Sequence, residues 1–287
     1  MPRDDESLGI YVHIPFCQEK CQYCDFLSFG GQNRKVQQDY VQALLREIHS
    51  YGCKKRVDSI FFGGGTPSLL PESMIQEILE ALRKDFMLAP DAEITIEANP
   101  GTISKEKLLT YRQAGINRLS IGVQSAEEDL LRRLGRIHSW QDFLDCYRWA
   151  REAGFTNINC DLMFALPDQS EAQWQHTLEA VLSLDPTPEH ISFYSLQLEE
   201  GTEFHRLHQE GKLHLTDEET DRRMYWSAAE QLANHVYEHY EISNAARPGY
   251  ASRHNLRYWT FGDYLGIGLG AHSFMNGVRF SNTTIIE

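Results

Sequence analysis

Three cysteines lie close together near the start of the chain, at Cys17, Cys21 and Cys24. A structural zinc site takes four ligands, commonly as two separated cysteine pairs, and the sequence has no second pair. A 4Fe-4S cluster also takes four ligands, so three protein thiolates leave one iron open to another molecule. The spacing therefore favours an iron–sulfur cluster over zinc. The polar residues between the cysteines argue against a third alternative, unliganded thiols in a core.

A glycine-rich segment, GGGTP at residues 63–67, is the second candidate for chemistry. Glycines let a ligand approach the backbone closely. A phosphate-binding loop is the competing interpretation, but the Gly-Lys-Ser/Thr ending is missing and Pro67 has no amide hydrogen to donate. We therefore expect backbone carbonyls of this segment to bind an ammonium group.

Short β-rich runs alternate with amphipathic helical stretches along most of the chain. Between the runs, apolar residues recur at spacings of three and four, which is typical of helices packed on one face. Repeated β-then-α units predict a parallel sheet with right-handed crossovers, so we expect an α/β fold, a partial (β/α)6 barrel. The predicted strands cover residues 9–14, 59–62, 93–98, 118–123, 157–164 and 190–198.

The pattern loosens after about residue 200. A helix is expected near residues 217–239, followed by sequence rich in glycine and aromatic residues. We therefore predict a barrel over residues 1–200 and a C-terminal extension over residues 201–287.

Polar residues follow the predicted strands at their carboxyl ends, which is where parallel barrels have their active-site residues. The first strand runs into the cysteine loop and the second into the glycine segment; Glu97, Gln124 and Asp161 belong to later strands. A helix cap or a surface acid would also explain Glu97 or Asp161. Asp161 nevertheless lies in an apolar run, where an unpaired carboxylate is costly, so contact with a ligand is the favoured interpretation.

Composition limits the classes of partner. The net charge of −14 argues against nucleic acid, which needs a concentrated positive surface. No run of about eighteen apolar residues is present, so no transmembrane segment is expected. The first ten residues lack an apolar signal core, which predicts a cytoplasmic protein. Arg247, Arg253 and Arg257 form a local basic exception, either a solvated loop or a contact for a carboxylate ligand.

The CxxxCxxC spacing, with Tyr23 before the last cysteine, resembles the signature of radical S-adenosylmethionine (SAM) proteins. Within that superfamily the chain resembles the group that contains oxygen-independent coproporphyrinogen III oxidases and HemW-type heme chaperones. The resemblance runs from about residue 9 to residue 272 and rests on YVHIPFC at 11–17, GGGTP at 63–67, IEANP at 96–100, IGVQS at 121–125, LGRIH at 134–138 and DLMFALP at 161–167.

This resemblance implies a 4Fe-4S cluster on the three cysteines, with SAM chelating the open iron. In members that complete the chemistry, one-electron reduction of SAM releases a 5′-deoxyadenosyl radical. Tyr23 is expected to pack against the adenine. The resemblance places the cofactor contacts at Tyr11, Tyr23, Gly64, Gly65, Thr66, Glu97, Gln124, Arg136 and Asp161.

Three features favour the chaperones over the oxidases. The oxidases carry a further cysteine two residues after the third, where this chain has Phe26, and they have a longer segment before the first strand. HNLRYW at 254–259 also resembles the HNxxYW motif of the chaperones. The motif implies that His254 binds heme, with aromatic rings on the porphyrin and Arg253 or Arg257 on its propionates. Without the resemblance, a surface histidine beside a core tryptophan is the simpler interpretation.

The resemblance therefore implies a protein that binds heme and delivers it to recipient heme proteins, respiratory proteins among them. The alternative is a coproporphyrinogen III oxidase, which decarboxylates porphyrinogen propionates by radical chemistry. The sequence leaves open whether the chain is an enzyme, assigns no catalytic residue, and does not decide on a homodimer. Members usually continue into a small C-terminal domain, so we expect the chain to be truncated before that domain.

Overall fold

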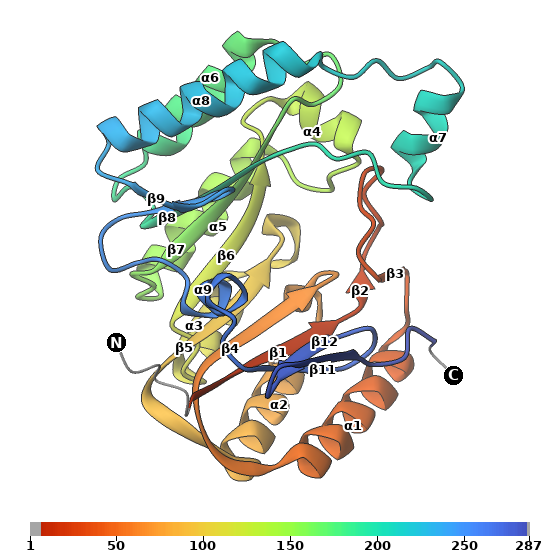
Figure 1. Cartoon of the computed structure of the whole chain (residues 1–287), viewed down its shortest axis with the longest axis vertical. Helices are drawn as coiled ribbons and strands as arrows, with labels where there is room; N and C mark the ends of the chain where they lie inside the picture. The colour runs from red at the N-terminus through yellow and green to blue at the C-terminus, as the bar shows by residue number, and fades with distance from the viewer. Residues whose placement is uncertain (1–6, 286–287) are drawn as a thin grey trace.

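The computed structural model describes residues 7–285. Within them, one curved sheet has the strand order β13-β12-β11-β1-β4-β5-β6-β7-β8-β10-β9 (Figure 1). Six neighbouring strands run parallel and form the wall of a partial barrel, which confirms the predicted fold class. These strands are β1 (Ser7–Ile14), β4 (Cys53–Gly64), β5 (Phe86–Ala98), β6 (Arg118–Gln124), β7 (Ile158–Phe164) and β8 (His190–Ser195).

Alternation along the strands explains the two faces of this wall. In β6, Leu119, Ile121 and Val123 are fully buried in the apolar core between sheet and helices. The residues between them face the barrel interior, because successive side chains of a strand point to opposite faces. The interior therefore receives polar side chains such as Ser120 and Gln124.

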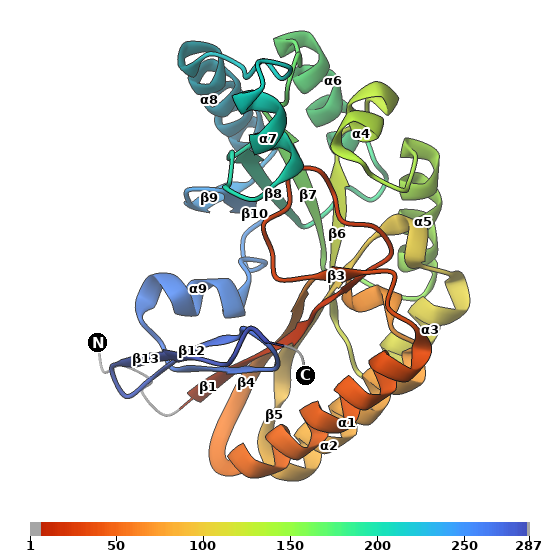
Figure 2. The same cartoon turned by 90° about the vertical axis from the view of Figure 1, so that its right-hand side faces the viewer.

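Helices cover the outer face of the sheet (Figure 2). Serine capping boxes begin two of them, at Ser139 and at Ser170, and each satisfies amides that the first helical turn leaves unpaired. The outer helices are α1 (Arg34–Tyr51), α2 (Glu72–Asp85), α3 (Lys105–Gln113), α4 (Glu128–Leu134), α5 (Trp140–Glu152) and α6 (Glu171–Leu182), with short 3-10 turns η1 (Pro67–Leu69) and η2 (Pro100–Thr102).

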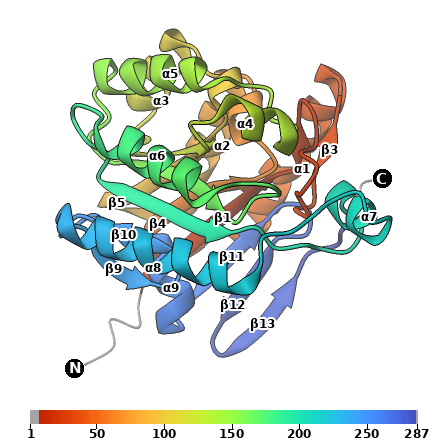
Figure 3. The same cartoon turned by 90° about the horizontal axis from the view of Figure 1, so that it is seen from above.

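The C-terminal part of the chain adds strands to both edges of the parallel wall. β10 pairs antiparallel with β8, and β11 pairs parallel with β1. The helix α9 lies on the inner side of the sheet, opposite α1, α2 and α3 (Figures 2 and 3). The domain boundary near residue 200 stays a prediction. The elements of this part are α7 (Glu203–Gln209), α8 (Glu218–Asn234), β9 (Glu238–Glu241), β10 (Asn244–Ala246), α9 (Arg253–Thr260), β11 (Tyr264–Ile267), β12 (His272–Met275) and β13 (Val278–Ser281).

The helix predicted near residues 217–239 is shorter than expected. α8 ends at Asn234, and Val236 has a φ of 67°, in the left-handed region that a helix cannot use. β9 then begins at Glu238. The last strand of the wall also ends early, at Ser195, rather than at residue 198.

Among residues 7–285, no helix has both the length and the apolar character needed to span a membrane. The cytoplasmic location stays a prediction, and residues 1–6, on which it partly rests, lie outside the described residues.

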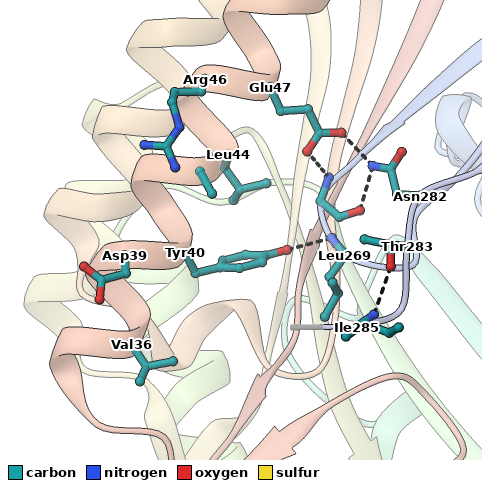
Figure 4. A pocket seen from close by; sticks show the side chains of 12 residues that line it. Val36, Asp39, Tyr40, Leu44, Arg46, Glu47, Leu269, Asn282, Thr283 and Ile285 are labelled. Atoms are coloured by element: carbon teal, nitrogen blue, oxygen red, sulfur yellow. Dashed lines mark hydrogen bonds between the residues drawn. The ribbon is translucent and has the colours of Figure 1, made fainter. Parts of the chain in front are cut away.

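A polar cluster joins α1 to the segment after β11 (Figure 4). The carboxylate of Glu47 accepts hydrogen bonds from the Gly268 amide at 3.0 Å and from Asn282 Nδ2 at 2.6 Å. The Tyr40 hydroxyl accepts from the Leu269 amide at 3.0 Å and donates to the carbonyl of His13, the residue next to the end of β1, at 2.8 Å. The α1 residues and the C-terminal residues that form these bonds line a cavity of about 610 Å³. The bond to His13 holds β1 in place just before the cysteine loop.

We expect Gly268→Ala to destabilise the protein more than Gly277→Ala. Both glycines have positive φ, 97° and 78°, which costs alanine about 1–2 kcal/mol. A Cβ on Gly268 would also lie 2.5 Å from the Tyr40 hydroxyl, whereas a Cβ on Gly277 meets nothing within 4 Å. Overpacking adds about 1–3 kcal/mol at Gly268 only. Urea unfolding followed by circular dichroism measures both losses; equal losses would contradict the crowding at Gly268.

Candidate functional site

The cysteine loop follows β1 and is closed at its base by a short parallel ladder. The ladder joins β2 (Phe16–Cys17) to β3 (Phe29–Gly30). His13 Nε2 donates to the carbonyl of Leu27 at 2.8 Å, since a carbonyl can only accept. Both ends of the loop are therefore attached to the first strand of the barrel.

The middle of the loop is held from the far side of the barrel through one residue, Gln22. Its amide donates to the carbonyl of Leu134, the last residue of α4, at 3.1 Å. Its carbonyl accepts from the amide of Phe204, in the first turn of α7, at 2.9 Å. The next residue, Tyr23, packs against a small apolar cluster that includes Leu134 and Phe204. Backbone hydrogen bonds thus place the segment between the second and third cysteines.

The cysteine sulfurs have polar neighbours from other parts of the barrel. Thr66 Oγ1 donates to Cys17 Sγ at 3.5 Å, and Arg136 Nη1 donates to Cys21 Sγ at 3.7 Å. Burial raises the pKa of the Cys24 thiol to about 11, and the charges of Cys21 and Cys17 add to the increase. The thiols of Cys21 and Cys17 therefore contribute to the electrostatic environment of Cys24.

In residues 7–285, no group of three histidine, cysteine, aspartate or glutamate side chains is arranged to hold one metal ion. A cubane cluster makes a different demand, because each thiolate binds a separate iron. The assignment of Cys17, Cys21 and Cys24 as cluster ligands stays a prediction.

The glycine segment packs tightly against the cysteine loop. Gly64 has a φ of 114°, and its amide donates to Glu97 Oε2 at 3.2 Å. A Cβ on Gly64 would lie 2.5 Å from the His13 ring, and a Cβ on Gly65 would lie 3.1 Å from Cys17 Sγ. Neither position has room for a larger residue, so the glycines let the loop and the strand end come together.

One cavity of about 450 Å³ opens between the cysteine loop and the strand ends. Of the residues predicted to contact SAM, only Tyr11 is absent from its lining. The cavity is lined by Cys17, Cys21, Cys24, Tyr23, Gly64, Gly65, Thr66, Glu97, Gln124, Arg136 and Asp161, together with Gly122, Met163 and Tyr194, which sequence reasoning did not single out.

Two acids on neighbouring faces of this cavity have raised pKa values. Burial, followed by the charge of Asp161, raises the pKa of Glu97 to about 8, although the Gly64 amide and Arg118 oppose the increase. Burial also raises the pKa of Asp161, against hydrogen bonds from neighbouring polar side chains. Both carboxyls are therefore suited to ligand groups that donate hydrogen bonds or carry positive charge.

Tyr11 is not part of the cavity lining. Its hydroxyl donates to His13 Nδ1 at 3.0 Å, and its ring stacks on Phe61 at a centroid distance of 6.3 Å. The structure therefore does not bring Tyr11 to the predicted cofactor contacts, and its role stays a prediction.

His254 is also inside the protein, with 1% of its surface exposed. Its Nδ1 lies 3.1 Å from the Ser59 hydroxyl and its Nε2 lies 3.0 Å from the Tyr258 hydroxyl. Burial, followed by the charges of Arg257 and Arg118, lowers the pKa of His254 to about 3. Both ring nitrogens thus have hydrogen-bond partners inside the protein, so neither is free to bind heme iron in this conformation. Heme ligation by His254 stays a prediction.

The arginines considered for propionates are paired with acids of the chain. Arg257 is buried and forms an ion pair with Asp58, while its Nε donates to Ser59 at 3.2 Å. Arg253 lies 3.3 Å from a carboxylate oxygen of Asp91. Arg257 therefore fixes α9 to β4, and the interpretation of a solvated basic loop is wrong for it.

Backbone contacts of the cysteine loop were not found from the sequence. The LGRIH segment was noticed only for its resemblance, yet the carbonyl of Leu134 holds Gln22 and Arg136 reaches Cys21. A carbonyl acceptor has no residue signature, because every residue carries one.

Comparisons with known proteins agree with this geometry. Residues 11–181 match the radical SAM superfamily. The heme chaperone HemW of Bacillus subtilis (strain 168) is 41% identical over 276 residues, which cover 95% of this chain and 72% of that protein. HemW of Escherichia coli (strain K12) is 42% identical over 268 residues, covering 92% and 69%. The chain belongs to the HemW family of radical SAM proteins.

A solved structure supports the same fold. The radical SAM enzyme coproporphyrinogen III oxidase (HemN) from Escherichia coli matches with a TM-score of 0.84 and 26% identity, over 98% of this chain and 68% of that one. The predicted resemblance is thus confirmed, and membership of the superfamily implies a 4Fe-4S cluster and SAM.

We expect Glu97→Gln to stabilise the cluster-free protein above pH 8. The carboxyl pKa rises from 4.5 to about 8 on folding, so the folded state binds more protons between these values and wild-type stability falls as pH rises through them. Glutamine stays neutral and avoids this loss, a gain on the order of 5 kcal/mol. Urea unfolding at pH 5, 7 and 9 measures the difference, with the exposed Glu80→Gln as the control. A difference independent of pH would contradict the buried acid.

Proposed function

We propose that Cys17, Cys21 and Cys24 hold the 4Fe-4S cluster and that SAM binds in the adjoining cavity. The carrying observation is that all three sulfurs line the cavity that also contains the glycine segment. Phe26, at the position of the oxidases' further cysteine, lies at the rim with 62% of its surface exposed. The donor set therefore fits a cluster with one open iron.

The cavity also contains polar atoms that a cofactor would satisfy. Within the described part of the chain, Gln124 Oε1 and Arg136 Nε are buried without hydrogen-bond partners. We propose that these groups, with Glu97 and Asp161, bind the polar parts of SAM and that Tyr23 contacts its adenine. When bound and reduced, the cofactors supply one-electron cleavage of SAM.

We expect Cys24→Ala to lose most of its cluster, because only two thiolates of the loop remain. Cys53→Ala is the matched control, since Cys53 is a half-buried free cysteine outside the loop. Iron and acid-labile sulfide, measured after anaerobic reconstitution, should fall in the first variant alone. Equal cluster content in both variants would contradict the cysteine assignment.

We further propose that the protein binds heme and delivers it to recipient heme proteins, since its relatives are named heme chaperones. The supporting observation is on α9, which exposes 41% of Tyr258 and 49% of Trp259, next to Phe261 at 78%. Flat aromatic rings suit the face of a porphyrin. Because His254 is enclosed, ligation through it would require α9 to move. Respiratory recipients and a homodimer stay predictions.

We expect Trp259→Ala to weaken heme affinity about fivefold or more, since about 1 kcal/mol of aromatic contact is lost. The control is Trp226→Ala on α8, which removes another exposed tryptophan, 62% exposed. Heme titration followed by absorption spectroscopy gives both affinities. Equal affinities would remove the exposed face of α9 from the heme site.

An unchanged heme spectrum in a folded His254→Ala variant would remove His254 as a ligand.

The likeness to HemN supports a second candidate, oxidation of coproporphyrinogen III. Three carboxylates, those of Glu19, Asp25 and Glu199, line the cavity and would repel a substrate with several carboxylates of its own. Multiple turnovers of coproporphyrinogen III, under anaerobic conditions with reductant and SAM, would overturn our preference for the chaperone.

A further inference from the structure

A chain of hydrogen bonds crosses the barrel interior from the candidate cofactor cavity to α9. Asn159 Nδ2 lies 2.8 Å from Asp161 Oδ1, and Asn159 Oδ1 lies 2.7 Å from His190 Nδ1. His190 Nε2 lies 2.8 Å from the Tyr240 hydroxyl, which lies 3.2 Å from Asn255 Nδ2. This chain of hydrogen bonds therefore links Asp161, which lines the cavity, to Asn255 of the HNLRYW segment.

Each bond in this chain has a defined direction. The Asn159 amide group donates to the Asp161 carboxylate, so its oxygen accepts from His190 Nδ1–H. Burial lowers the pKa of His190, and the neutral ring then accepts at Nε2 from the Tyr240 hydroxyl. The Tyr240 oxygen in turn accepts from Asn255. Every donor points towards Asp161, so the chain has only one arrangement that satisfies all of its members.

The cavity end of the chain fixes the orientation of Asp161. Asn159 binds one carboxylate oxygen, and the Ser120 hydroxyl donates to the other at 3.1 Å. Asn159 also donates to Ser120 at 2.7 Å, so the two supports hold each other. Both supports are nearly fully buried, and Asp161 and Ser120 line the cavity. The remaining lone pairs of Asp161 are thus available to a ligand there.

The other end of the chain contacts the helix with the exposed aromatic side chains. Asn255 precedes Trp259 by about one turn of α9, and its amide is shared between Tyr240 and Glu241 Oε1, at 3.2 and 3.3 Å. Asn255 Nδ2 carries two hydrogens, so it can donate to both acceptors at once and connect α9 to Tyr240 and to Glu241. A shift at Asp161 would act on α9 through the bond to Tyr240.

Building on the proposed SAM site, we propose that Asn159, His190 and Tyr240 are positioning residues that orient Asp161 towards SAM and transmit occupancy of the cavity to α9. Binding of SAM fixes Asp161, and through the chain it fixes Asn255. Coupling of this kind is reciprocal, so a ligand on α9 alters SAM affinity by the same factor.

Tyr240→Phe tests the coupling because it removes only the hydroxyl between His190 and Asn255. Tyr237→Phe is the matched control: its buried hydroxyl donates to the Pro188 carbonyl, outside the chain. Hydrogen–deuterium exchange of residues 253–260 is measured on the cluster-reconstituted protein with and without saturating SAM, and calorimetry gives the SAM affinity. This readout requires no heme.

We expect SAM to slow exchange of α9 about fivefold or more in the wild type and in Tyr237→Phe, and less than about twofold in Tyr240→Phe. No effect of SAM on wild-type α9, an undiminished effect in Tyr240→Phe, or the same loss in Tyr237→Phe would overturn the coupling. In those cases calorimetric binding would leave the proposed SAM site intact. Absence of SAM binding to the wild type would instead refute the proposed site, and the coupling with it.

Discussion

The arrangement of the candidate site depends on backbone hydrogen bonds that hold an irregular loop from both sides of the barrel. A loop with polar residues between its cysteines has no core of its own, so its position must come from outside contacts. The β2–β3 ladder supplies these at its base, and Gln22 supplies them at its middle through α4 and α7. The relative positions of the cysteines therefore depend on these contacts with the surrounding barrel.

Polar side chains inside the barrel add a second requirement. Buried polar groups are costly unless they are hydrogen-bonded, and the interior contains acids, amides and buried histidines such as His190 and His254. Most of these groups bind one another across neighbouring strands. The unpaired atoms at Gln124 and Arg136 instead border the cavity, which is where a ligand would satisfy them. Other buried atoms without partners, such as Thr95 Oγ1 and Arg118 Nε, belong to residues outside the cavity lining.

Local features of the sequence predicted most of the fold. The alternation of β-rich and helical stretches depends on residues close in sequence, and the structure confirms it. The sequence also predicted the lining of the cavity, because parallel strands must place their carboxyl ends together. It did not predict the long-range packing: α9 places His254 beside Ser59 of β4, 195 residues away, and the Tyr11 ring stacks on Phe61. The hydrogen bonds that connect Asp161 to Asn255 also join residues far apart in the sequence, so no spacing pattern in the sequence predicts them.

The pairing of β1 with β11 has a consequence for synthesis of the protein. β1 is synthesised long before residues 264–267, which cover one of its edges. Until then the nascent chain presents an open strand edge next to the cysteine loop, and such edges can pair with other chains. The strand that leads into the cysteine loop is therefore fully paired only after residues 264–267 have been translated.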